Sequence, residues 1–98
     1  MTGISLHPYW IEFDLSIDDD PPFGFLLGCG VTAFTQDDAL AIVRDLAFGG
    51  TNLPRITKLI EDVDVRTLDE GHVRPNMGTV SIRGIWFPLG YENPYAKI

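Results

Sequence analysis

The 98-residue sequence contains one cysteine, Cys29, and only seven lysine and arginine residues. A single cysteine excludes an intramolecular disulfide, so the cysteine content gives no sign of an oxidising compartment. The few basic residues are outnumbered by 14 acidic ones, which leaves a formal charge of −7. Because nucleic-acid phosphate is bound by clustered Lys and Arg, we expect no direct binding to nucleic acid.

Long hydrophobic runs are also missing. A membrane helix needs about 20 predominantly apolar residues, and the longest candidate, residues 23–34, is interrupted by Gly24, Gly28, Gly30 and Thr32. The segment 1–8 lacks the basic and apolar regions of a secretory signal. We therefore expect a cytoplasmic protein without a membrane segment.

Motifs for catalysis and cofactor binding are sparse. Gly28 and Gly30 lack the further glycine and the strand-to-helix context of a dinucleotide-binding fingerprint. Cys29 and His72 are the pair that a thiol enzyme would use, and this alternative stays open. Cys29 lies in an apolar stretch, however, where a free cysteine is usually buried. We expect a protein that is not an enzyme and has no cofactor.

The composition favours a folded domain. Hydrophobic residues make up 45% of the chain and aromatic residues 11%, well above the range in which a highly charged chain stays disordered. A chain of this length forms about one domain with a core of its own. We interpret residues 1–98 as a single domain.

Alternating apolar and polar residues predict a strand at 8–15, because side chains of a strand point to opposite faces in turn. The segment 16–22 combines three aspartates with two prolines and predicts an exposed acidic loop. Apolar and β-branched residues at 25–34 predict a second strand.

A helix is predicted at 36–48. Thr35 and Asp38 have the spacing of a capping box, with Asp in place of the usual Glu or Gln. Apolar residues then recur every three or four positions, and Gly49 with Gly50 supplies a C-terminal stop.

The rest of the chain completes an α+β pattern. Residues 56–65 fit a helical stripe or a strand, and their β-branched content favours the strand. Residues 67–78 predict a loop with one short helical turn, and 79–87 predict a last strand. The order strand, strand, helix, strand, strand implies a mainly antiparallel sheet of about four strands with one helix packed on one face.

The acidic residues form two clusters, Asp18 to Asp20 and the run from Glu61 to Glu70. Carboxylates of the second cluster, together with His72, are candidate ligands for a hard cation. Neither cluster has the spacing of an EF-hand, so we interpret both as solvated charge and expect no metal site. Trp10 shares a strand face with two acids, and we expect its side chain to be exposed.

Three segments together resemble a known family. They are YWIEFD at 9–14, GCGVTA at 28–33 leading into DDAL at 37–40, and RPNMG at 74–78 followed by RGIWFP at 83–88. The chain resembles, over about residues 9–91, small and mostly uncharacterised bacterial proteins, some of which look like immunity proteins of contact-dependent or other polymorphic toxin systems. These motifs are apolar and glycine-rich, and they carry over no catalytic residue.

The resemblance implies a protein that binds and neutralises a cognate bacterial toxin. Many such toxins are nucleases with basic clefts, which an acidic protein would fit by charge complementarity. The expected toxin-binding residues are Asp18, Asp19, Asp20, Glu61, Asp62, Asp64, Asp69, Glu70 and Trp10. The alternative is a non-enzymatic housekeeping or regulatory domain that self-associates or binds a small ligand through its aromatic and glycine-rich segments. A single chain gives no information on oligomeric state.

Overall fold

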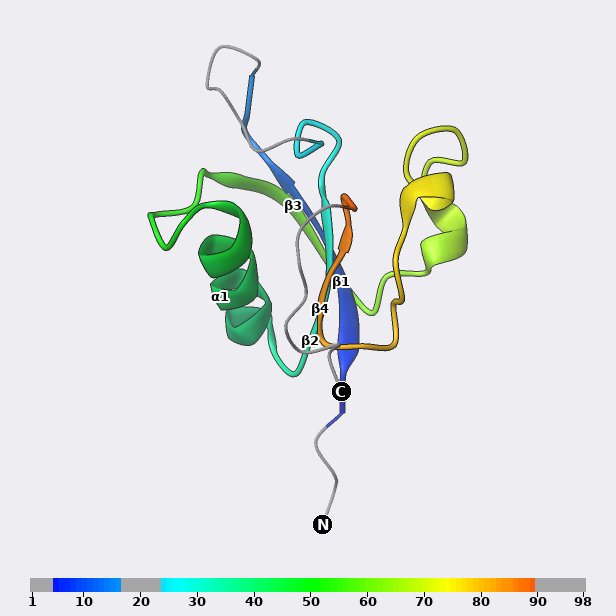
Figure 1. The fold of residues 1–98 in the computed structure, drawn as a ribbon, viewed down its shortest axis with the longest axis horizontal. Coiled ribbons are helices and arrows are strands. Elements are labelled where there is room, and N and C mark those ends of the chain that lie inside the picture. The colour runs from blue at the N-terminus through cyan, green and yellow to red at the C-terminus, as the bar shows by residue number, and fades with distance from the viewer. Residues whose placement is uncertain (1–4, 17–23, 90–98) are drawn as a thin grey trace.

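A four-stranded sheet forms the middle of the protein in this computed structural model, which describes residues 5–16 and 24–89 (Figure 1). The strand order is β3-β1-β2-β4, and each neighbouring pair is antiparallel. The strands are β1 (His7–Phe13), β2 (Cys29–Ala33), β3 (Ile56–Glu61) and β4 (Gly84–Phe87). The predicted α+β fold is confirmed. The strand predicted at 56–65 forms over 56–61, and a 3₁₀ helix begins at Val65.

One face of the sheet is covered by the helix α1 (Gln36–Ala47), as predicted (Figure 1). The Thr35 side chain accepts a hydrogen bond from the Asp38 amide at 3.0 Å, and the Asp38 carboxylate accepts one from the Phe34 amide. The first bond satisfies an amide that the helix start leaves unpaired, and the second joins the first turn to the residue before the cap. Asp38 also forms an ion pair with Arg83, which ties the helix start to the chain just before β4.

The core under α1 consists of side chains from alternate positions of β1 and from the apolar stripe of the helix. Ile11 and Val43 are both fully buried there. Three phenylalanines, Phe13, Phe25 and Phe48, pack at the far end, with ring centroids 5.5 to 6.3 Å apart. This face is therefore closed by regular secondary structure.

The opposite face of the sheet is covered by residues 62–80, here called the covering segment (Figure 1). It contains the short 3₁₀ helices η2 (Val65–Thr67) and η3 (Arg74–Asn76) and is otherwise irregular. Beneath it lies a second core of five buried residues. They are Trp10, Val63, Val73, Trp86 and Phe87.

Two glycines of the predicted second strand make room for the tryptophans of this second core. A Cβ at Gly28 would lie 2.5 Å from a ring carbon of Trp10, and one at Gly30 would overlap the ring of Trp86. Since protein interiors are packed nearly as densely as crystals, neither position has space for a side chain. The glycine-rich and aromatic segments therefore pack against each other.

The expectation that Trp10 is exposed is wrong. Trp10 is only 4% exposed, because the covering segment lies over its face of the sheet. The polar residues that alternate along the strand had suggested that this face was open to solvent. The neighbouring acid has a local role instead, since the Trp10 indole N–H donates to the Glu12 carboxylate at 2.8 Å.

The second and last strands are shorter than predicted. Residues 24–27 form a turn, in which the Gly28 amide donates to the Phe25 carbonyl, so β2 begins only at Cys29. Residues 80–83 turn and bend before β4, and the Thr32 hydroxyl donates to the Val80 carbonyl there. None of the helices within 5–16 and 24–89 is long and apolar enough to cross a membrane.

Candidate functional site

The structure divides the expected acidic surface into separate groups. Asp18, Asp19 and Asp20 lie outside the described residues. Glu61 and Asp62 lie at the end of β3, beside His7 of β1. The remaining acids, Asp64, Asp69 and Glu70, lie further along the covering segment, which begins at Asp62, and each pairs with a different neighbour.

The group at the end of β3 is linked by hydrogen bonds. His7 Nδ1 and Asp62 Oδ1 are 2.7 Å apart, and the hydroxyl of buried Tyr9 donates to the Glu61 carboxylate. Burial, followed by the negative charges of Glu61 and Asp62, raises the pKa of Tyr9 above its ordinary value. Tyr9 therefore stays protonated and able to donate this bond.

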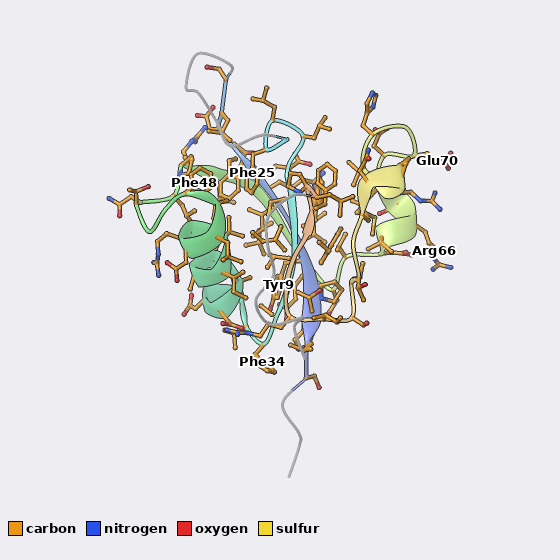
Figure 2. The ribbon with its side chains drawn as sticks, viewed as in Figure 1. Tyr9, Phe25, Phe34, Phe48, Arg66 and Glu70 are labelled. Atoms are coloured by element: carbon orange, nitrogen blue, oxygen red, sulfur yellow. The ribbon has the colours of Figure 1, made fainter. Side chains whose placement is uncertain are left out.

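On the covering segment, Asp64 accepts two hydrogen bonds from the Arg66 side chain, at 2.9 and 3.0 Å. These bonds, with one from the Arg66 amide, lower the pKa of Asp64 to about 2. Figure 2 shows Arg66 and Glu70 pointing away from the sheet into solvent. Glu70 is 3.3 Å from Arg74.

Asp69 stabilises the turn that follows it. Its carboxylate is 2.8 Å from the His72 amide and 2.9 Å from His72 Nδ1, and these hydrogen bonds lower the pKa of Asp69. Over residues 61–74 the five carboxylates face two arginines, a formal charge of −3. Residues 61–74 are therefore acidic, but Arg74 makes their net charge less negative than that of residues 61–70 alone.

A hollow of about 250 Å³ lies between the covering segment and the sheet, here called the Trp10 hollow. Its wall is mainly apolar, and Glu12, Lys58 and Asp69 supply its charged groups. Trp10 is therefore buried and still lines a surface hollow. The lining residues are Trp10, Glu12, Leu27, Lys58, Ile60, Thr67, Leu68, Asp69 and Val73.

A second hollow of about 280 Å³, here called the His72 hollow, shares Leu27 with the first. Its lining residues are Gly24, Leu27, His72, Asn76, Phe87, Pro88 and Leu89. Leu27 is 48% exposed and Leu89 is 52% exposed, which is high for large apolar side chains. The two hollows place exposed apolar surface next to the acids of the covering segment. No sequence pattern indicated the two hollows. Leu27 and the covering segment lie about 40 residues apart in the sequence, and only the fold brings them together.

Cys29 and His72 do not form a thiol and base pair. Cys29 is fully buried in the core under α1, and burial raises the pKa of its thiol. The His72 side chain is 75% exposed on the covering segment, which lies over the other face of the sheet. The thiol is therefore neither accessible nor ionised at neutral pH.

No protein-family model, no curated protein and no solved structure matches this chain.

Proposed function

We propose that this protein is an immunity protein, which neutralises a cognate bacterial toxin by binding it and not by catalysis. The contact surface is the face formed by the covering segment and Leu27. The observation that carries the proposal is the pair of adjoining hollows that share Leu27, of which the Trp10 hollow has the acids Glu12 and Asp69 in its wall.

Apolar hollows with charged residues around them have the general anatomy of a protein-binding surface. Binding energy comes mainly from a few side chains that fill well-packed pockets, while the surrounding polar residues exclude water and select the partner. In this protein a partner side chain that enters the Trp10 hollow would contact Trp10, Ile60 and Leu68. Trp10 then contributes from the wall of the hollow and not as a protruding anchor.

The acids define the chemistry of the partner. A surface with a formal charge of −3 over residues 61–74, on a chain of charge −7, attracts a basic protein and speeds its approach. Asp64, Asp69 and Glu70 border the hollows or lie on the segment that forms them, while Glu61 and Asp62 extend the acidic surface to the end of β3. A nuclease toxin with a basic cleft fits this chemistry.

The alternative, a small-ligand or self-associating domain built on the aromatic and glycine-rich segments, has less support. Gly28 and Gly30 lie against the rings of Trp10 and Trp86, so these segments are occupied with each other inside the protein. Where Trp10, Gly24 and Phe87 do reach the surface, they form the walls of the two hollows together with residues of the covering segment.

The first experiment is to co-express the protein with the product of the adjacent gene, because immunity genes normally lie beside their toxin genes. We expect the two proteins to copurify and the growth of toxin-producing cells to be restored. A harmless neighbour that forms no complex would contradict the proposal.

Two neighbouring leucines then test the surface. Leu26 and Leu27 are 52% and 48% exposed, but only Leu27 lines the hollows. We expect Leu27→Ala to weaken toxin binding about tenfold, since truncating a central interface residue costs more than about 1 kcal/mol. Leu26→Ala should leave binding unchanged. Equal effects of the two substitutions in a titration calorimeter would place the interface elsewhere.

A further inference from the structure

The geometry points to a binding site for a divalent metal ion at the end of β3, formed by His7, Glu61 and Asp62. Each of these residues offers one ligand atom, and the three atoms lie within 4.8 Å of one another. His7 was not among the candidate ligands considered from the sequence, because it is 55 positions from Asp62 and only the pairing of β1 with β3 brings them together. The proposal does not depend on the proposed function.

The spacing of the ligand atoms suits a single ion. Zn²⁺ binds imidazole nitrogen and carboxylate oxygen at about 2.0–2.2 Å in a tetrahedral arrangement, so two of its ligand atoms lie about 3.3–3.6 Å apart. His7 Nδ1 and Asp62 Oδ1 are 2.7 Å apart, and binding would separate them by less than about 1 Å. Glu61 is exposed, and rotation of its side chain by on the order of 1 Å completes the set.

The ligand types favour a borderline ion such as Zn²⁺. Ca²⁺ and Mg²⁺ prefer sites made of oxygen alone, whereas imidazole with carboxylates suits Zn²⁺ and related ions. Binding replaces the hydrogen bond between His7 and Asp62: Nδ1 gives up its hydrogen and Nε2 takes one up, so the imidazole stays neutral with its proton on Nε2. The two carboxylates and the neutral imidazole balance the charge of a divalent ion.

Tyr9 can orient one ligand toward the ion once the Glu61 side chain has rotated. Its side chain is 1% exposed, and its hydroxyl donates to the Glu61 carboxylate. Hydrogen bonds of this kind orient a metal ligand, and their loss typically lowers metal affinity about 10- to 100-fold. Three protein ligands leave a coordination position for water or for a group of a partner.

The test uses the full-length protein without an affinity tag, titrated with Zn²⁺ in a calorimeter. We expect binding of one ion per chain, weakened at least about tenfold by His7→Ala and by the isosteric Glu61→Gln. The matched control is His72→Ala, because His72 also lies 2.9 Å from a carboxylate, that of Asp69, without being part of the three-residue group. This control should bind Zn²⁺ as the unmodified protein does.

A second readout locates the ion. Mn²⁺ is paramagnetic and broadens nearby NMR signals, so we expect it to broaden the amide signals of His7, Tyr9 and residues 61–62 before those of 69–72. Glu61→Gln keeps the shape of the side chain and should remain folded, so a loss of binding in this variant reports on the ligand. Absence of Zn²⁺ binding, or binding that His7→Ala and Glu61→Gln leave intact, would overturn the proposal.

Discussion

The two faces of the sheet are closed in different ways. On one face, a capped helix packs its apolar stripe against β1 and β2, and the ion pair between Asp38 and Arg83 joins its start to the chain before β4. On the other face, an irregular covering segment lies over two tryptophans and leaves hollows at its borders. The comparison suggests that the helical face carries the fold and the segment-covered face is available for recognition, because binding regions are drawn from less regular structure.

The largest expected effect on stability comes from Gly30 of β2, which packs against the Trp86 ring. Gly30→Ala would drive a methyl group into the Trp86 ring, and we expect it to lower the free energy of unfolding by about 3 kcal/mol. Gly71→Ala is the control, since the nearest atom to its Cβ would be Asp69 Oδ2 at 3.9 Å. Urea unfolding should show the control within about 0.5 kcal/mol of the unmodified protein. Equal effects would mean that Gly30 is not tightly packed.

A smaller effect distinguishes the ion pairs of the two faces. Asp38→Asn removes a partly buried charged partner of Arg83, and we expect a loss of about 2 kcal/mol at pH 7. Asp64→Asn should have little effect, because the Asp64 pair with Arg66 is exposed and exposed pairs contribute little. Both are measured by urea unfolding.

The Asp38 pair also predicts a pH dependence. Hydrogen bonds from Arg83 lower the pKa of Asp38 in the folded protein below its ordinary value of 3.8. Its contribution is therefore complete above that value and is lost as the pH falls toward the lowered pKa. We expect the unmodified protein to lose more stability than Asp38→Asn between pH 5 and about pH 3. Parallel pH profiles would contradict this role of Asp38.

The same substitution on the two faces gives the smallest difference. Val43 and Val73 are 0% and 2% exposed, one under α1 and one under the covering segment. We expect Val43→Ala to cost about 2 kcal/mol and Val73→Ala about 1 kcal/mol, because Val73 borders the Trp10 hollow and its truncation enlarges an existing surface hollow instead of opening an enclosed cavity. A greater loss for Val73→Ala in urea unfolding would reverse the comparison.

The sequence predicted what depends on neighbouring residues. The helix was placed within one residue, since its cap at Thr35 and its stop at Gly49 are local signals. The burial of Trp10 was not predicted, because it depends on a segment more than 50 residues away that covers its face. For the same reason the sequence indicated the acids of the covering segment but neither the hollows beside them nor the meeting of His7 with Asp62.

The most direct test compares two pairs of neutralised acids in binding to the copurified partner. The first double variant, Asp69→Asn with Glu70→Gln, removes two charges from the covering segment. The second, Asp37→Asn with Asp45→Asn, removes two charges from α1. The new amides keep oxygen acceptors for the local turns. We expect the first pair to slow association at low salt by roughly threefold or more and the second to leave it nearly unchanged. Equal slowing by both pairs, or slowing only by the pair on α1, would contradict the assignment of recognition to the segment-covered face.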